Sequence, residues 1–289
     1  MQVAILGIGL MGRPMADRLC AAGHTIHVWN RTASKALPLV EHGAVVHATA
    51  ADAVRTANLT ITMLEDGAVV EQVVFEQGVD AAMPSDSLWV DMSSIAPAQA
   101  RDHAQRISTR GVAYLDAPVS GGTLGAEQGT LAIMAGGAAT DLERARPVLD
   151  ALGKATLVGP TGSGQLTKLA NQMIVGTTIG AVAEALLMCE QGGADPAQVR
   201  LALTGGFADS RILQVHGQRM VARDFAARGR MTAQRKDLRN ALQTAKELGF
   251  DAPISTLLEQ LYTEAIDQGY QDLDQSALFL ELARRNSMA

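Results

Sequence analysis

The chain has 289 residues, of which 47% are hydrophobic, so it is long enough for two domains and too apolar to be disordered. Its formal net charge is −6 and it carries no basic run, which argues against nucleic acid as a partner. The two cysteines, Cys20 and Cys189, lie far apart in apolar helical patterns. We therefore expect no disulfide framework, no signal peptide before the first strand, and a cytoplasmic location.

The first half of the chain alternates short apolar runs with helical patterns. The runs predict strands at residues 3–6, 25–29, 45–46, 59–63, 88–91, 113–116, 131–135 and 156–158. Helices are expected between them at residues 13–22, 33–41, 51–57, 68–75, 97–110 and 141–152. This alternation implies parallel pairing through right-handed crossovers, and the continuous apolar strands indicate a sheet buried on both faces. We expect an α/β, doubly wound domain with a mostly parallel sheet at residues 1–161.

The second half contains helical patterns without a convincing strand. Residues 164–191 predict one long helix, and a further helix begins with Asp195 as its N-cap and Pro196 in its first turn. We expect an all-α domain at residues 162–289, joined to the first by the long helix. Residues 173–188 are apolar on nearly every side, which favours self-association as a dimer or tetramer. The alternative is a helix that is central within its own domain.

Two classes of site are disfavoured by the sequence. The most apolar stretch contains Glu184 and is shorter than about 18 uninterrupted apolar residues, so no membrane span is expected. The six histidines show none of the spacings typical of metal sites, and no bound metal is expected.

A glycine turn follows the first strand directly. Gly7, Gly9 and Gly12 form a G-x-G-x-x-G pattern between a strand and a helix, which is the dinucleotide-binding fingerprint of the Rossmann domain. Gly7 permits a tight turn, Gly9 lets the backbone approach a pyrophosphate, and Gly12 lets the helix pack close to the strand. The first amides of the helix would then face the phosphates. The alternative is a purely structural turn.

The second strand lacks the carboxylate that usually binds the ribose 2′-hydroxyl. It ends in Asn30, Arg31 and Thr32, which offer neutral groups and a guanidinium suited to a 2′-phosphate. We therefore expect NADP in preference to NAD. In the alternative interpretation Arg31 stacks on the adenine or is a solvated loop charge, and either cofactor binds.

Three further stretches carry candidate chemistry. Residues 116–122 follow a strand, where Ser120 brings a hydroxyl and the Gly121-Gly122 backbone can present amides to a carboxylate. The long helix carries Lys168, Asn171 and Gln172 on one face, and a half-desolvated lysine can exchange a proton with a carbonyl oxygen. Lys236 and Asp237 lie at the expected start of a later helix, as a surface ion pair or as groups reaching cofactor or substrate. In the alternative interpretation residues 116–122 form an ordinary glycine turn, and Lys168, Lys236 and Asp237 are solvated surface charges.

Together these stretches resemble the β-hydroxyacid dehydrogenase family, which includes 3-hydroxyisobutyrate dehydrogenase and the tartronate, glyoxylate and succinic semialdehyde reductases. The resemblance covers essentially the whole chain and rests on residues 7–12, 116–122, 162–172 and 236–238. It implies that Lys168 is the catalytic acid/base and that Ser120, Gly121, Gly122, Asn171 and Gln172 bind the substrate. The cofactor-binding residues that it implies are Gly7, Ile8, Gly9, Leu10, Met11, Gly12, Asn30, Arg31, Thr32, Met63, Leu64, Ser94 and Lys236.

One position departs from many relatives, which carry Asn where Gln172 stands. The run Lys168-Leu-Ala-Asn-Gln-Met-Ile-Val175 is similar to the tartronate semialdehyde reductase branch. We therefore expect an NADP-preferring oxidoreductase that interconverts a small aldehyde acid and its hydroxy acid. The alternatives are an NAD-dependent dehydrogenase of 3-hydroxyisobutyrate or another β-hydroxyacid, an imine reductase, which generally lacks the lysine, and a non-catalytic cofactor-binding module.

Overall fold

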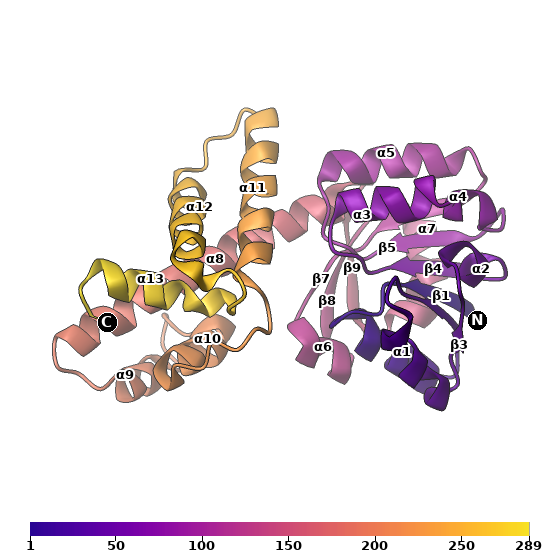
Figure 1. The fold of residues 1–289 in the computed structure, drawn as a ribbon. Helices are drawn as coiled ribbons and strands as arrows, with labels where there is room; N and C mark the ends of the chain where they lie inside the picture. Colours follow the sequence, from indigo (N-terminus) through magenta and orange to yellow (C-terminus); the bar gives the residue numbers. More distant parts are fainter. Residues whose placement is uncertain (289) are drawn as a thin grey trace. The chain divides into compact units, whose positions relative to one another are not determined.

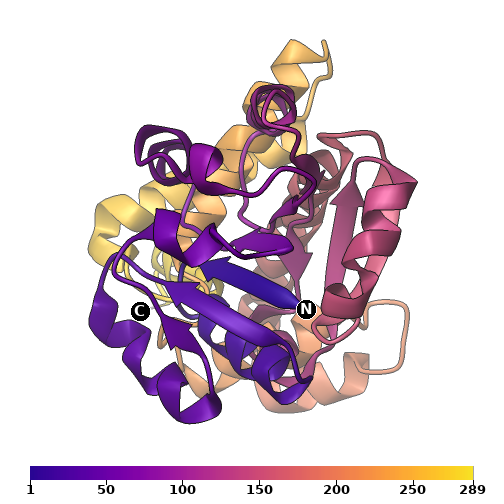
Figure 2. The same ribbon diagram turned by 90° about the vertical axis from the view of Figure 1, so that its right-hand side faces the viewer.

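The computed structural model describes residues 1–288 and divides into two compact units, Met1–Lys168 and a second that begins at Leu169. Figures 1 and 2 show an α/β unit followed along the chain by a helical one. The strands of the first unit are β1 (Gln2–Leu6), β2 (Thr25–Trp29), β3 (Val45–Val46), β4 (Leu59–Thr62), β5 (Leu88–Asp91), β6 (Ala113–Asp116), β7 (Val119–Ser120), β8 (Leu131–Gly136) and β9 (Gly153–Gly159). These elements confirm the predicted fold class.

The described strands form one sheet in the order β3-β2-β1-β4-β5-β6-β8-β7, with β9 paired to β8. Pairing is parallel from β3 to β6 and between β8 and β9, whereas β8 runs antiparallel to β6 and β7. The chain leaves β1 toward β2 and later returns to β4 on its other side. Such a reversal creates a crevice at the carboxyl ends of the strands, where ligands bind in open α/β sheets.

The central strands β1, β4, β5 and β6 are buried on both faces, as their apolar runs predict, whereas the edge strands β3 and β9 are partly exposed. Along β1, Val3 and Ile5 belong to one core while Ala4 and Leu6 belong to the other. The first core is shared with α1 (Gly12–Ala21) and α7 (Ala139–Leu149). The second is shared with α2 (Ala50–Val54), α3 (Gly67–Glu71), α4 (Val79–Ala82) and α5 (Pro97–Ser108). The alternation follows from the two-residue period of a strand.

The local predictions differ from the structure in a few segments. The helix expected at residues 33–41 is two short 3-10 segments, η1 (Ala33–Lys35) and η2 (Leu37–His42). Pro38 has no N–H to continue an α-helical ladder, so the continuous helix is interrupted. The helix at 68–75 ends as a π turn, η3 (Gln72–Glu76), and the short helix α6 (Gly122–Gln128) was not expected in its glycine-rich sequence.

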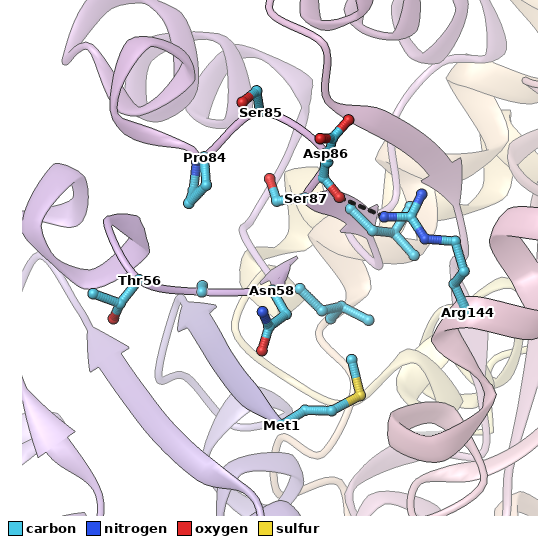
Figure 3. A pocket seen from close by; sticks show the side chains of 11 residues that line it. Met1, Thr56, Asn58, Pro84, Ser85, Asp86, Ser87 and Arg144 are labelled. Atoms are coloured by element: carbon cyan, nitrogen blue, oxygen red, sulfur yellow. Dashed lines mark hydrogen bonds between the residues drawn. The ribbon is translucent and has the colours of Figure 1, made fainter.

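A cavity of about 570 Å³ lies at the amino ends of the central strands, on the opposite edge of the sheet from the glycine turn. Arg144 lines it and donates a hydrogen bond of 2.6 Å from Nη2 to the carbonyl oxygen of Asp86 (Figure 3). None of the predicted site residues lines this cavity.

The second unit consists of helices around a separate apolar core. They are the remainder of α8 (Ser163–Gln191), α9 (Pro196–Leu203), α10 (Arg211–Ala222), α11 (Met231–Glu247), α12 (Pro253–Ala265), η4 (Ile266–Tyr270), η5 (Gln275–Ala277) and α13 (Leu278–Arg285). Asp195 caps α9 as predicted, because its carboxylate accepts a 2.9 Å hydrogen bond from the Ala197 N–H. By length and composition alone α8 could cross a membrane, but a core helix passes the same test, and the side chains of Ile179 and Ala183 are buried in the core.

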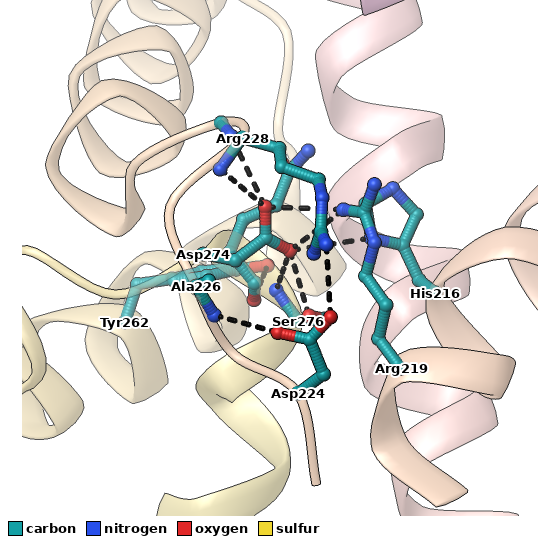
Figure 4. A network of polar contacts seen from close by, with 10 residues as sticks. His216, Arg219, Asp224, Ala226, Arg228, Tyr262, Asp274 and Ser276 are labelled. Carbon is teal, nitrogen blue, oxygen red and sulfur yellow. Dashed lines mark hydrogen bonds and ion pairs between the residues drawn. The ribbon is translucent and has the colours of Figure 1, made fainter. Parts of the chain in front are cut away.

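One buried carboxylate organises the segment that leads into α11 (Figure 4). Asp274 is fully buried and accepts hydrogen bonds from Arg219 Nη1 at 3.1 Å, from the Gly229 N–H at 3.0 Å and from Ser276 Oγ at 2.6 Å. Burial alone would raise the pKa of Asp274, but the His216 ring at 3.5 Å, the hydrogen bonds from Ser276 and the Arg219 charge hold that pKa well below its usual value. The ionised group therefore fixes the loop before α11.

Candidate active site

The glycine turn has the geometry that its spacing predicts. Gly7 adopts a φ of +107°, and a Cβ on Gly12 would lie 1.9 Å from the Gly7 carbonyl oxygen, so neither position tolerates a side chain. A Cβ on Gly9 would meet nothing within 4 Å. The backbone at Gly12 therefore lies close to Gly7, while the side of the turn at Gly9 is open.

This open side fits the diphosphate of a dinucleotide. Gly9 and Leu10 are exposed, and α1 begins at Gly12 with no acidic residue in its first turn and no side-chain cap. The positive end of the helix dipole is thus left available to an anion. Ile8 is buried and Met11 is half-buried beside the turn.

Asn30 supports the turn from the end of β2. Its Oδ1 accepts a 2.9 Å hydrogen bond from the Ile8 N–H, and its Nδ2 donates at 2.9 Å to the Thr32 carbonyl oxygen. The side chain therefore connects the glycine turn to the loop after β2, a role that the residue type alone did not reveal. Arg31 and Thr32 are exposed in that loop.

The loops after β4 and β5 are tied to each other. The Leu64 N–H donates to Ser93 Oγ at 3.0 Å, and Thr62 Oγ1 donates to the buried Asp91 at 2.8 Å. Met63, Leu64 and Ser94 are half-buried in these two loops. All three lie at the carboxyl edge of the sheet, and their contact with the cofactor stays a prediction.

Asp116 links the end of β6 to the first turn of α8. Its carboxylate is fully buried and accepts hydrogen bonds from the Gly162 N–H at 2.7 Å and the Gln165 N–H at 2.8 Å. Burial raises its pKa to about 6, although these backbone donors oppose the shift. The Gln165 side chain adds bonds to the Ile95 N–H at 3.1 Å and to the Ser93 carbonyl oxygen at 2.8 Å.

Glycines allow this close approach of α8 to the sheet. A Cβ on Gly164 would lie 2.3 Å from the Met134 carbonyl oxygen, and a Cβ on Gly136 would lie 2.6 Å from an Asp116 carboxylate oxygen. Lys168 follows one turn later on α8 and is half-buried. The position of its backbone is therefore fixed by the Asp116 and Gln165 bonds.

The loop after β6 presents the predicted carboxylate-binding group. Ser120 is half-buried at the end of β7, and Gly121 and Gly122 are exposed. Gly121 has a φ of +137° and Gly122 a φ of +64°, conformations that residues with a Cβ rarely adopt. The loop thus needs both glycines for its shape.

The second unit carries its own polar cluster. Gln172 Nε2 donates to Asp237 Oδ2 at 2.9 Å and to Gln234 Oε1 at 3.0 Å, while Asn171 Nδ2 donates to Gln172 Oε1 at 2.8 Å. Lys236 Nζ pairs with Asp237 Oδ1 at 3.3 Å. The expectation that Lys236 begins a helix was wrong, because α11 starts at Met231 and places Lys236 in its second turn.

One group of side chains in the described residues has the composition of a metal site. Glu71, Asp102 and His103 offer ligand atoms within 4.8 Å of one another. Arg106, however, donates to Glu71 at 2.9 Å and to Asp102 at 3.1 Å, so a guanidinium already pairs with both carboxylates. The absence of a metal stays a prediction.

Sequence analysis missed residues whose roles depend on distant partners. Asp116 was part of a motif, but its bonds to α8 span 46 and 49 positions. No local sequence pattern marks Gln165 or Gln234. Gly164 lies in the predicted 162–172 stretch, but its need for close packing on β6 and β8 depends on the fold.

Comparison with known proteins is consistent over the whole chain. Residues 2–162 match the "NAD binding domain of 6-phosphogluconate dehydrogenase", and residues 162–282 match the "NAD-binding of NADP-dependent 3-hydroxyisobutyrate dehydrogenase". The chain is 43% identical to the 2-hydroxy-3-oxopropionate reductase of Escherichia coli (strain K12), with 100% of both chains covered. It is 32% identical to the chloroplastic glyoxylate/succinic semialdehyde reductase 2 of Arabidopsis thaliana, over 99% of this chain and 80% of that protein. A solved structure of Mycobacterium tuberculosis 3-hydroxyisobutyrate dehydrogenase with L-serine has a TM-score of 0.88 and 32% identity, covering 97% of this chain and 98% of the other.

Proposed function

This chain belongs to the 3-hydroxyisobutyrate dehydrogenase family of NAD(P)-dependent β-hydroxyacid oxidoreductases, and we propose that it is an NADP-preferring reductase of a small aldehyde acid. The full-length similarity to a 2-hydroxy-3-oxopropionate reductase carries the proposal and makes tartronate semialdehyde the first candidate substrate. Succinic semialdehyde and glyoxylate are the next candidates, and the corresponding hydroxy acids are the products.

The proposed chemistry assigns a separate task to each part of the site. A bound nicotinamide supplies the hydride to the carbonyl carbon. Lys168, in its ammonium form, donates a proton to the carbonyl oxygen, and it takes one back in the oxidative direction. Ser120 and the amides of Gly121 and Gly122 hold the substrate carboxylate, which fixes the orientation of the carbonyl. General acid catalysis of this kind contributes a factor of about 10² to 10⁴ in rate.

The cofactor preference rests on the loop after β2. Arg31 is exposed there and no carboxylate follows the strand, so a 2′-phosphate would meet a guanidinium rather than a repelling charge. Lys236 is proposed to lie near the nicotinamide. The Asn30 side chain contributes by holding the loop against the glycine turn through its bond to the Ile8 N–H.

Self-association and a cytoplasmic location complete the proposal. Apolar side chains remain exposed along α8, with Ile174 at 67% and Met188 at 71% exposure, and a second copy would cover them. We propose a dimer or tetramer built on this helix, and no nucleic acid or membrane as a partner.

A substrate panel with both cofactors tests this function. We expect the highest kcat/KM for tartronate semialdehyde with NADPH, and a lower value for the same substrate with NADH. Replacing Arg31 with Gln should lower kcat/KM with NADPH while leaving the NADH value nearly unchanged, because only the 2′-phosphate contact is lost. Exposed Arg55 replaced with Gln is the matched control, and a variant at Arg31 that keeps its NADPH preference would remove the guanidinium from the proposal.

The panel also separates the alternatives. A preference for 3-hydroxyisobutyrate with NAD would favour the dehydrogenase alternative, and reduction of a cyclic imine without reduction of aldehyde acids would favour an imine reductase. Cofactor binding without turnover of any panel member would indicate a non-catalytic module.

A further inference from the structure

Two groups in the polar cluster of the second unit can only accept hydrogen bonds, and they fix which way the neighbouring amides are turned. Asp237 is buried, with 5% of its surface exposed, and as a carboxylate it only accepts hydrogen bonds. The main-chain carbonyl oxygen of Gln172 is also only an acceptor, and it receives Gln234 Nε2 at 2.9 Å. The orientation of the buried Gln234 amide is thereby set, with Oε1 turned toward the Gln172 side chain at 3.0 Å.

These acceptors determine the orientation of the Gln172 amide. Its NH₂ group has two protons, and they are used on Asp237 Oδ2 at 2.9 Å and on Gln234 Oε1. Turning the amide over would place its oxygen against a carboxylate and leave two buried acceptors without donors. The Gln172 oxygen therefore remains as an acceptor for donors other than Asp237 and Gln234.

The same logic extends to Asn171. The Gln172 oxygen accepts a 2.8 Å hydrogen bond from Asn171 Nδ2, so the amino end of the Asn171 side chain is committed to the cluster. With Nδ2 used in this bond, Oδ1 is the acceptor atom of the Asn171 side chain. The orientation of this half-buried amide is thus transmitted from the Asp237 carboxylate through one intervening side chain.

The packing of α8 and α11 is adapted to this arrangement. A Cβ on Gly176 would lie 2.7 Å from Gln234 Nε2, so a larger residue there would displace the amide that orients Gln172. Lys236 Nζ lies 3.3 Å from Asp237 Oδ1, so a cation faces the carboxylate oxygen that does not bond Gln172.

We infer that Asp237 is a positioning residue that acts through Gln172 to present the Asn171 carbonyl oxygen as an acceptor for a hydroxyl group on the substrate. This inference rests on the proposed function and narrows its substrate class to aldehyde acids with a hydroxyl beside the reacting carbonyl. Such a hydroxyl donates to the Asn171 oxygen, whereas an unsubstituted analogue leaves this half-buried acceptor without a donor. A site built to bond a hydroxyl discriminates against the analogue that lacks it.

The test compares two substrates of equal length. Tartronate semialdehyde carries the hydroxyl and malonate semialdehyde does not, so the ratio of their kcat/KM values measures the contribution of the acceptor. We expect a wild-type ratio of about ten, because one hydrogen bond worth about 1.4 kcal/mol changes kcat/KM tenfold. Asp237→Asn frees the Gln172 amide to turn over, and we expect this ratio to fall close to one.

The controls distinguish positioning from general damage. Glu247→Gln makes the same acid-to-amide change at an exposed position on α11 and should leave the ratio unchanged. Asn171→Ala removes the acceptor itself and keeps the test decisive if the Asp237 variant does not fold. A structural effect alone would lower both kcat/KM values equally and preserve the ratio.

Binding supplies a readout that does not depend on turnover. With NADP⁺ present, calorimetry should show tighter binding of tartronate than of malonate to the wild type, and equal binding to Asp237→Asn. A ratio and an affinity difference that survive in both the Asp237 and the Asn171 variants would overturn the inference. If the wild type reduces neither aldehyde, the proposed function itself fails, which is a separate result.

Discussion

At the scale of single residues, the pKa of a buried carboxylate depends on the hydrogen-bond donors around it. Asp116 loses its hydration at the end of β6 and receives two backbone N–H groups in exchange, and its pKa rises to about 6. Asp274 is equally buried, but it receives a guanidinium and a hydroxyl in addition to backbone donors, and its pKa falls. The same residue type thus responds oppositely to pH according to its donors.

The raised pKa of Asp116 predicts a specific pH dependence of stability. The folded protein holds this proton more tightly than the unfolded chain, whose value is near 3.8. The resulting stabilisation is complete below that value and is lost as the pH rises through about 6. Between pH 7 and pH 5 we expect the wild type to gain about 1 kcal/mol in the free energy of unfolding relative to Asp116→Asn.

Urea denaturation of both proteins at the two pH values measures this difference. Asp86→Asn, an exposed acid on a loop, serves as the control and should follow the wild type. Identical pH dependence in the wild type and the Asp116 variant would show that the carboxylate does not titrate in this range.

At the scale of elements, the first turn of α8 is held by partners that are remote in sequence. Asp116 and Gln165 connect it to the ends of β6 and β5, and glycines bring the helix backbone close to β8. Lys168 therefore depends on the sheet for its placement, although it lies on a helix that continues into the second unit.

A methyl group at Gly164 tests this dependence. Alanine normally stabilises a helix relative to glycine, but here its Cβ would lie 2.3 Å and 2.6 Å from two backbone oxygens. We expect Gly164→Ala to lower the free energy of unfolding by about 1–3 kcal/mol and to reduce kcat as Lys168 moves. Thermal unfolding and steady-state kinetics measure the two effects.

A second alanine substitution provides the comparison. Gly206→Ala, whose nearest neighbour would be 3.5 Å away, should leave the melting temperature nearly unchanged. If Gly164→Ala raises the melting temperature and keeps full activity, the helix does not need its close approach.

Sequence reasoning succeeded where the signal was local. The strands are short continuous apolar runs, the glycine turn follows a strand directly, and Asp195 caps the adjacent helix, so each pattern lies within a few residues. It failed at Asp116, Gln165 and Gln234, whose partners are 46 or more positions away. Such contacts depend on how strands and helices pack, and a periodic pattern carries no information about them.

At the scale of the whole molecule, some apolar side chains of α8 are not covered by the helices around it. Ile174 and Met188 remain mostly exposed, although neighbouring positions of the helix pack into the core. Exposed apolar surface on a long helix favours association with another copy.

We therefore expect light scattering to give a mass that is a multiple of the 30.3 kDa chain. Ile174→Glu combined with Met188→Glu should shift the mass toward the monomer, because a charge cannot be buried in an apolar interface without a partner. Leu37→Glu, an exposed apolar position in the first unit, is the control and should leave the mass unchanged. A wild-type protein that is monomeric at assay concentrations would contradict this expectation.

The proton-transfer role of Lys168 is the central claim, and single-turnover kinetics of Lys168→Ala test it most directly. With the enzyme in excess of NADPH and with saturating tartronate semialdehyde, we expect the rate of NADPH oxidation to fall by a factor of about 10² or more. The Kd for NADPH should stay near the wild-type value. A variant that binds NADPH normally and oxidises it at the wild-type rate would contradict the assignment of the acid.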